Sequence, residues 1–232
     1  MIWRMVALLV VAAGLGGCDR NPQPTTPKTG NQNITVSAPS SPEPTLKGPE
    51  RHVLALGDSL FAGYGLRPEA AYPQRLEAAL RARGLNVRVA NAGVSGDTTA
   101  DGLARLDFTL ASQPQPPDLV LICLGGNDML RGLPVAQTRA NLAAILAQLQ
   151  QRHIPALLMG MLAAPNLGKA YDTDFNAIYP VLARQYHAGL VPFFLAAVIA
   201  RPDLRQADHM HPTAPGVDAV VRSTVGEVSA SL

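Results

Sequence analysis

The stretch Val53-Leu-Ala-Leu-Gly-Asp-Ser-Leu60 decides the fold of this chain. A run of apolar, β-forming residues ends abruptly at a glycine, an acid and a serine, and glycine-rich chain follows. This pattern is typical of a buried parallel strand that ends at the carboxyl edge of an α/β sheet, where ligands bind. The serine, Ser59, begins the next helical turn with its hydroxyl exposed. It can act as a nucleophile if the chain also supplies a base, a group that orients the base, and donors for an oxyanion.

Strand and helix signals alternate from residue 51 to the end of the chain. With 232 residues, of which 47% are hydrophobic, the chain can build one sizeable core. The alternation predicts a central parallel sheet covered by helices on both faces, a three-layer α/β/α sandwich. Further strands are expected over residues 87–90, 118–124, 156–161 and 190–195, and helices over 72–83, 98–111, 134–152, 172–187 and 213–232.

The first fifty residues differ sharply in composition from the rest of the chain. Residues 1–18 combine Arg4, an apolar run over 5–15 and a small-residue site before Cys18, which predicts an export signal. Leu-Gly-Gly-Cys18 resembles a bacterial lipoprotein box, so we expect a periplasmic protein that a lipid on Cys18 anchors to a membrane; ordinary signal cleavage stays open. Residues 19–50 are rich in proline, serine and threonine and predict a disordered tether, with the folded domain over 51–232. The net charge of +2 gives no sign of nucleic-acid binding.

Two glycine-containing turns follow predicted strands and should reach the same sheet edge as Ser59. In residues 91–99, Gly93 is the glycine best suited to aim a backbone N–H at a ligand, although the segment could be only a loop before a helix. In Gly-Gly-Asn127-Asp, the Asn127 side chain offers two N–H donors and cannot ionise, so it can stabilise an oxyanion. Taken alone, such a turn is usually only structural.

The segment Asp208-His-Met-His211 precedes the last predicted helix. An acid and a histidine three residues apart can point the same way from a tight turn. Asp208 can then accept a hydrogen bond from one ring nitrogen of His211 while the other nitrogen faces Ser59, the arrangement of a nucleophile, its base and the base's orienting group. His209 is expected to be a neighbour without a catalytic role. A metal is not expected, because no second group of ligands completes a coordination shell.

These four segments together resemble the SGNH (GDSL) hydrolases, in order and in spacing, over residues 53–232. The similarity is closest to the periplasmic arylesterase, acyl-CoA thioesterase and lysophospholipase branch. The resemblance implies a flavodoxin-like fold and hydrolysis through an acyl-enzyme without a cofactor or metal. It also implies that a loop contacts the acyl chain; the loop residues are Leu162, Ala163, Ala164 and Pro165.

The sequence therefore predicts a serine esterase that acts on aryl or short and medium acyl esters, and that could extend to thioesters or lysophospholipids. Its catalytic residues are Ser59, His211 and Asp208, and its oxyanion donors are the backbone N–H groups of Ser59 and Gly93 and the amide of Asn127. A small ester is the expected partner, and a monomer the expected state. Two alternatives remain: an acetyl-sugar esterase, which the aromatic content of 5% disfavours, and a binding lipoprotein without catalysis.

Overall fold

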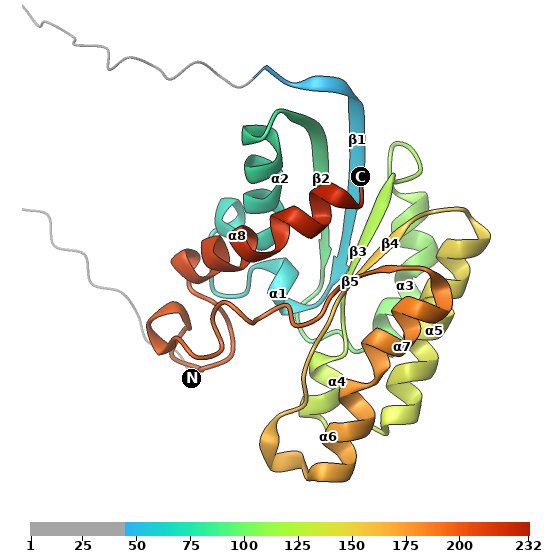
Figure 1. The fold of residues 1–232 in the computed structure, drawn as a ribbon, viewed down its shortest axis with the longest axis vertical. Coiled ribbons are helices and arrows are strands. Elements are labelled where there is room, and N and C mark those ends of the chain that lie inside the picture. Colours follow the sequence, from blue (N-terminus) through green and yellow to red (C-terminus); the bar gives the residue numbers. More distant parts are fainter. Residues whose placement is uncertain (1–44) are drawn as a thin grey trace, which may run out of the picture. The chain divides into compact units, whose positions relative to one another are not determined.

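The computed structural model describes residues 45–232, and a parallel sheet of five strands carries the fold (Figure 1). The strands lie in the order β2-β1-β3-β4-β5, and each neighbouring pair is parallel. This confirms the predicted parallel sheet. The strands are β1 (Lys47–Gly57), β2 (Leu85–Gly93), β3 (Leu119–Cys123), β4 (Ala156–Met159) and β5 (Gly189–Val191).

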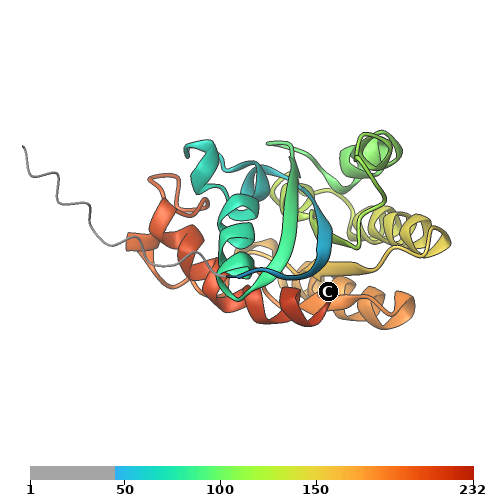
Figure 2. The same ribbon diagram turned by 90° about the horizontal axis from the view of Figure 1, so that it is seen from above.

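Helices cover both faces of the sheet, so the predicted three layers are confirmed. On one face α2 (Tyr72–Ala82) packs against α8 (Ala214–Ala230). On the other, α5 (Val135–Gln151) packs against both α3 (Thr99–Ala111) and α7 (Ile178–Tyr186). Figure 2 shows the strands between these two groups of helices. The two faces follow from the strand order. The crossover from β1 to β2 and the later crossovers from β2 to β3, β4 and β5 run in opposite directions along the sheet, and right-handed crossovers in opposite directions lie on opposite faces.

The strand order also determines where a ligand can bind. The chain moves from β1 outward to β2 and then crosses back to β3 on the other side of β1. The carboxyl ends of these three strands therefore border a topological switch point, the usual crevice of an open α/β sheet. Short elements occupy this edge or follow the later strands: α1 (Ser59–Ala62), α4 (Gly126–Leu130), α6 (Lys169–Asn176), and the 3-10 turns η1 (Pro68–Ala70), η2 (Pro165–Leu167) and η3 (Pro202–Leu204).

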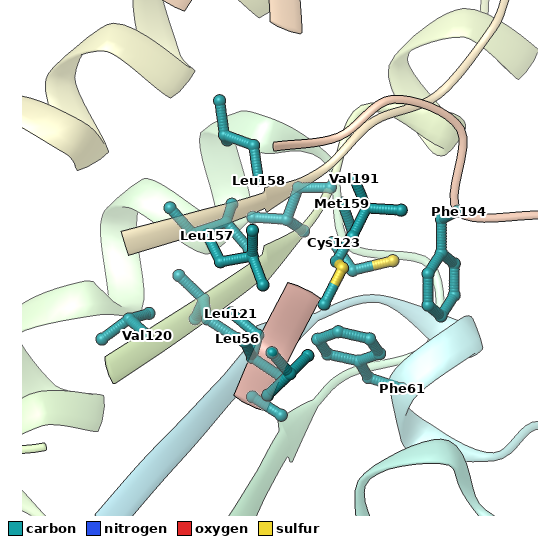
Figure 3. Close-up of a cluster of buried hydrophobic side chains, with 14 of the residues drawn as sticks. Leu56, Phe61, Val120, Leu121, Cys123, Leu157, Leu158, Met159, Val191 and Phe194 are labelled. Atoms are coloured by element: carbon teal, nitrogen blue, oxygen red, sulfur yellow. The ribbon is translucent and has the colours of Figure 1, made fainter. Parts of the chain in front are cut away.

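An aromatic cluster anchors the short helix that begins at Ser59. The Phe61 ring is fully buried, stacks on Tyr72 with centroids 5.2 Å apart, and meets Phe194 edge-on at 5.7 Å. Figure 3 shows Phe61 and Phe194 at the end of the apolar core formed by the strands. A side chain at Gly57 would meet the Phe61 ring at 2.7 Å, so this turn requires glycine. Ser59 thus lies between β1 and Phe61, and because packing immobilises both, it also restricts the position of the serine.

The buried thiol of Cys123 lies in the same core, at the end of β3. Burial raises its pKa well above the usual range for a thiol. Its surroundings are those of an unreactive packing residue.

Several boundaries differ from the prediction: β2 is longer than expected, β4 and β5 are shorter, and two further differences have a clear physical reason. Strand β1 begins at Lys47 instead of near residue 51, because the Lys47 N–H donates to Gly84 O at 2.8 Å and extends the pairing with β2. The helix predicted over residues 172–187 is two helices, α6 and α7, with Ala177 between them. Pro180 explains this break, since proline has no N–H to donate to the carbonyl four residues earlier.

The export signal, Cys18 and most of the predicted tether lie outside the described residues. Within residues 45–232, no helix is both long enough and apolar enough to cross a bilayer.

Candidate active site

The structure brings Ser59, His211 and Asp208 into one hydrogen-bonded line. Ser59 is the first residue of α1, directly after β1, whereas the other two residues lie in the turn before α8. His211 Nε2 is 2.7 Å from Ser59 Oγ, and His211 Nδ1 is 2.6 Å from Asp208 Oδ2. Residues 152 positions apart in the chain thus form the predicted arrangement of hydroxyl, imidazole and carboxylate. This geometry suits removal of the hydroxyl proton by the imidazole.

The Asp208 carboxylate also shapes the turn that carries it. Its Oδ1 accepts the backbone N–H groups of Met210 at 2.9 Å and His211 at 3.0 Å, while Oδ2 faces the imidazole. Partial burial raises the pKa of Asp208, but the hydrogen bonds from the His211 ring and from these two N–H groups outweigh it and lower the pKa to about 2. The carboxylate is therefore ionised at every pH at which an imidazole titrates.

Two residues that the sequence did not single out hold this turn against the nucleophile. The Tyr64 ring lies 4.6 Å from the His211 ring, centroid to centroid, and is 52% exposed. The Gln206 amide nitrogen donates to Tyr64 O at 2.8 Å and to Pro212 O at 2.9 Å. The turn after α1 and the turn before α8 are thereby joined. Both contacts link distant segments, so no local sequence signal could have identified them.

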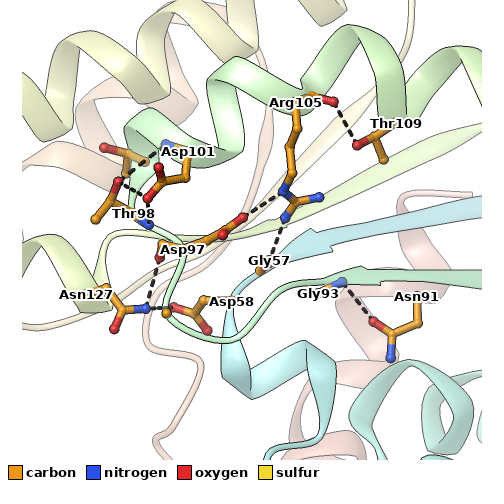
Figure 4. Close-up of polar contacts among 12 residues, drawn as sticks. Gly57, Asp58, Asn91, Gly93, Asp97, Thr98, Asp101, Arg105, Thr109 and Asn127 are labelled. Atoms are coloured by element: carbon orange, nitrogen blue, oxygen red, sulfur yellow. Dashed lines mark hydrogen bonds and ion pairs between the residues drawn. The ribbon is translucent and has the colours of Figure 1, made fainter.

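Asn127 lies at the N-terminal end of α4, directly after β3, where the sequence predicted it. Its Nδ2 donates to the carbonyl of Asp97 at 2.9 Å and lies 3.4 Å from Asp58 Oδ2 (Figure 4). The first bond fixes the orientation of the amide and leaves its second N–H with only a long contact. That N–H is the one available to a developing oxyanion.

Gly93 does not fit the oxyanion role predicted for it. Its N–H donates to the side chain of Asn91 at 2.9 Å, as Figure 4 shows. The need for glycine at position 93 has another reason. A Cβ at Gly93 would collide with the backbone nitrogen of Ala62 in α1. Glycine is needed here for the close approach of β2 to α1, and its donor is already taken.

Gly96, three residues further along the same loop, is a better candidate. Its φ of 90° lies in the left-handed region that favours glycine, and its carbonyl accepts from Arg131 Nη2 at 2.7 Å. Among residues 45–232, no acceptor is bonded to the N–H of Gly96 or to that of Ser59. Gly96 also directly precedes Asp97, whose carbonyl holds Asn127. The sequence signal, a second glycine in this loop, was visible but did not distinguish the two.

Asp58, which precedes the nucleophile, is a buried acid with 2% of its surface exposed. Its Oδ1 accepts the Leu60 N–H at 3.0 Å and caps α1. Burial raises the pKa of Asp58 to about 6; the bond from Leu60 and the nearby His211 oppose this shift, and the carboxylates of Asp97 and Asp128 add to it. The folded protein therefore binds a proton here that the unfolded chain releases near pH 4.

Asp58→Asn is expected to stabilise the protein more at pH 8 than at pH 4.5. A carboxyl whose pKa is raised by folding favours the folded state below its unfolded pKa, and this contribution is lost as the pH rises through about 6. The gain at pH 8 should be about 1–3 kcal/mol in the free energy of unfolding, measured with urea. An equal difference between the two proteins at both pH values would contradict the raised pKa.

The predicted substrate loop lies beside α4. Leu162 is 44% exposed, whereas Ala163 is buried and donates its N–H to Asn176 Oδ1 at 2.7 Å. The Ala164 N–H contacts the Met129 sulfur of α4 at 3.1 Å, and Pro165 begins η2. Of the first three residues, Leu162 presents the most accessible apolar side chain.

His209 is exposed, with a φ of 60°, and its backbone carbonyl accepts from Arg205 Nη1 at 2.8 Å. Its side chain makes no hydrogen bond with the described residues. No cluster of three or more His, Cys, Asp or Glu side chains suited to a metal occurs in residues 45–232.

Comparison with known proteins places this geometry in context. The model of the GDSL-like Lipase/Acylhydrolase family matches residues 55–219. The chain is 42% identical over 160 residues to an arylesterase of Vibrio mimicus, covering 69% of this chain and 79% of that protein. It is 42% identical over 160 residues to "Thioesterase 1/protease 1/lysophospholipase L1" of Escherichia coli K12, covering 69% of this chain and 74% of that protein.

Solved structures agree with these relatives. AlinE4, described as an SGNH-hydrolase family esterase, shares 58% sequence identity and superposes with a TM-score of 0.69 over 80% of this chain and 98% of its own. A crystal structure of TesA shares 37% identity with a TM-score of 0.74, covering 78% of this chain and 100% of that one.

Proposed function

The chain belongs to the GDSL-like lipase/acylhydrolase family and hydrolyses ester bonds as a serine hydrolase; from this premise we propose that Ser59, His211 and Asp208 are its catalytic residues. The observation that carries the proposal is the pair of short contacts that His211 makes, 2.7 Å to Ser59 Oγ and 2.6 Å to Asp208 Oδ2. A base that contacts both a hydroxyl and an ionised carboxylate is poised for nucleophilic catalysis.

The reaction proceeds through an acyl-enzyme. Ser59 Oγ attacks the ester carbonyl while its proton moves to His211 Nε2, and the resulting imidazolium then protonates the leaving alkoxide. In the second half of the reaction, His211 takes a proton from water as the water oxygen attacks the acyl carbonyl. The imidazolium then returns the proton to Ser59 Oγ, and the carboxylic acid is released. Asp208 keeps the proton of the neutral imidazole on Nδ1, so that Nε2 is free to accept, and it stabilises the imidazolium.

Three donors hold the oxyanion: the backbone N–H groups of Ser59 and Gly96 and the side-chain amide of Asn127. Support for this set comes from the free N–H groups of the two backbone donors and from the fixed orientation of the amide. Each donor in such a site typically contributes about 3–4 kcal/mol to transition-state stabilisation. Gly96 replaces the Gly93 that the sequence suggested.

The surroundings of the site favour an ester with an apolar acyl chain or leaving group. The Tyr64 ring lies against the His211 ring at an angle of 35°. Met210 precedes His211 in the same turn with 45% of its surface exposed, and Leu162 projects from the loop beside α4. Exposed apolar side chains around a catalytic centre are best explained by contact with an apolar ligand. Thioesters of the same acyl groups fit the same site, because the serine attacks the same carbonyl.

A panel of substrates tests this assignment. The protein should hydrolyse p-nitrophenyl esters from acetate to octanoate and acyl-CoA thioesters, and should act on acetylated xylobiose at least about 100-fold more slowly in kcat/KM. Leu162→Ser should lower kcat/KM about 10-fold more for octanoate than for acetate, because each buried methylene contributes about 0.8 kcal/mol. Phe108→Ser, which changes an exposed apolar residue on α3, is the matched control. Preference for the acetylated sugar would replace the proposed substrate class.

Export and membrane anchoring remain proposals that rest on residues 1–18. The charged and apolar segments of an export signal and the Gly-Gly-Cys18 site support a location outside the cytoplasm, with a lipid on Cys18 as the anchor. Residues 19–44 would then separate the catalytic domain from the membrane.

A further inference from the structure

We propose that Arg105 is a positioning residue for the oxyanion site, acting through Asp97 on Asn127. Arg105 projects from α3 toward the carboxyl edge of the sheet (Figure 4). Its Nε donates to Asp97 Oδ2 at 2.6 Å and its Nη2 to the carbonyl of Gly57 at 2.9 Å. The inference rests on the oxyanion role proposed for Asn127, which it extends to a residue outside the catalytic line.

Asp97 connects this arginine to the oxyanion donors. Its carboxylate pairs with Arg105, its carbonyl accepts from Asn127 Nδ2 at 2.9 Å, and its N–H donates to Val94 O at 3.1 Å. Gly96, the other loop donor, is the preceding residue. A shift of the Asp97 backbone would therefore move both donors at once.

Gly57, whose carbonyl accepts from Arg105, is held in place by the sheet. It is the last residue of β1, two positions before Ser59, and it pairs with both neighbouring strands. By bonding to Gly57 O, Arg105 ties the oxyanion loop to the strand that delivers the nucleophile. The Val94 N–H of the same loop donates to this carbonyl at 3.0 Å, so Arg105 adds a side-chain link beside a backbone one and helps to set the distance between the serine oxygen and the oxyanion donors.

The ion pair between Arg105 and Asp97 is strengthened by its partial burial. The side chains of Arg105 and Asp97 are only 20% and 12% exposed, so water screens their attraction poorly. Loss of either partner would leave a partly buried charge without compensation. A guanidinium presents several donors in a rigid fork, which allows it to satisfy a carboxylate and a carbonyl from different elements; a lysine ammonium lacks that fixed fork geometry.

Thr98 and Asp101 fix the start of α3 and thereby the position of Arg105. The Thr98 hydroxyl and the Asp101 carboxylate form a capping box at the N-terminus of the helix. The helix axis is therefore set directly after Asp97, and Arg105 reaches back from it. Thr98 is the N-cap, which leaves the Asp97 carboxylate for the pair with Arg105.

Arg105→Met is expected to lower kcat about 10- to 100-fold while KM changes less than about 3-fold, because the oxyanion donors lose alignment and ground-state binding does not depend on them. Arg105→Lys should recover only part of the loss. The matched control is Arg152→Met, which should leave kcat unchanged. It removes an exposed arginine at the end of α5 that pairs with Asp107 of α3, the helix that carries Arg105. An Arg105→Met protein with unchanged kcat would overturn the proposal.

A double-mutant cycle with Asn127→Ala separates this proposal from the proposed function. Asn127→Ala alone should lower kcat about 100- to 1,000-fold. If Arg105 acts through Asn127, adding Arg105→Met to that protein should lower kcat by a clearly smaller factor than it lowers the wild-type kcat, because only the Gly96 donor is left to be displaced. Independent effects that multiply would refute the positioning role, whereas an unaffected kcat for Asn127→Ala alone would refute the oxyanion role itself. Thermal melts verify folding; if Arg105→Met does not fold, Asp97→Asn takes its place in the cycle.

Discussion

Ser59→Ala should lower kcat/KM for p-nitrophenyl butyrate by about 10,000- to 1,000,000-fold, the largest effect expected of any substitution in this protein. Without Oγ, no acyl-enzyme can form, and His211 has no hydroxyl to deprotonate. The oxyanion donors remain and account for the residual rate over water. The fold should be unaffected, since Ser59 is only half-buried and the buried Phe61 anchors α1.

Covalent labelling gives an independent readout of the same prediction. A fluorophosphonate should add one phosphonyl group to the wild-type protein, and mass spectrometry of peptides should place it on Ser59. The Ser59→Ala protein should remain unlabelled, while Ser223→Ala, a change on α8 where the hydroxyl donates to Val220 O, should label normally. Label on another residue, or more than about 1% residual activity, would show that Ser59 is not the nucleophile.

Asp208→Asn is expected to lower kcat about 1,000- to 10,000-fold. Asparagine can keep the acceptor for the Met210 and His211 N–H groups, so the turn should persist. Its NH₂ group, however, faces His211 Nδ1 as a donor and favours the tautomer with the proton on Nε2. That tautomer cannot accept the Ser59 proton, and the imidazolium also loses its counter-charge.

Two comparisons distinguish this explanation from simple loss of structure. Asp208→Ala should have a similar effect on kcat but a lower melting temperature than Asp208→Asn, because it removes the acceptor for both backbone N–H groups. Asp203→Asn, which breaks an exposed ion pair with Arg201 in the preceding turn, should retain nearly full activity. If Asp208→Asn keeps more than about one tenth of wild-type kcat, Asp208 does not control the tautomer of the base.

The positioning role proposed for Arg105 has a consequence for other substitutions in α3. Arg105 touches neither Ser59 nor His211, yet its two hydrogen bonds join β1 to the loop that carries Gly96 and Asp97. Substitutions in α3 that tilt the helix should therefore change kcat more than KM.

Several features of this protein were determined by short stretches of sequence. The apolar run that stops at Gly57 marks the strand before the nucleophile, and the spacing of Asp208 and His211 specifies a turn that aims both side chains together. Asn127 was recognisable for the same reason, since it follows the most apolar strand directly. In each case the information lies within a few consecutive residues, because strand burial and tight turns are local properties of the chain.

Other features were decided only by tertiary structure. The choice between Gly93 and Gly96 depends on which N–H already has an acceptor and on a left-handed φ, and neither is visible in a glycine-rich loop read as letters. The tie from Arg105 to Gly57 spans 48 residues, and the contact of Gln206 with Tyr64 spans 142. Hydrogen-bond direction and long-range contact depend on where the packed sheet places each backbone, so they become determined only when distant segments meet.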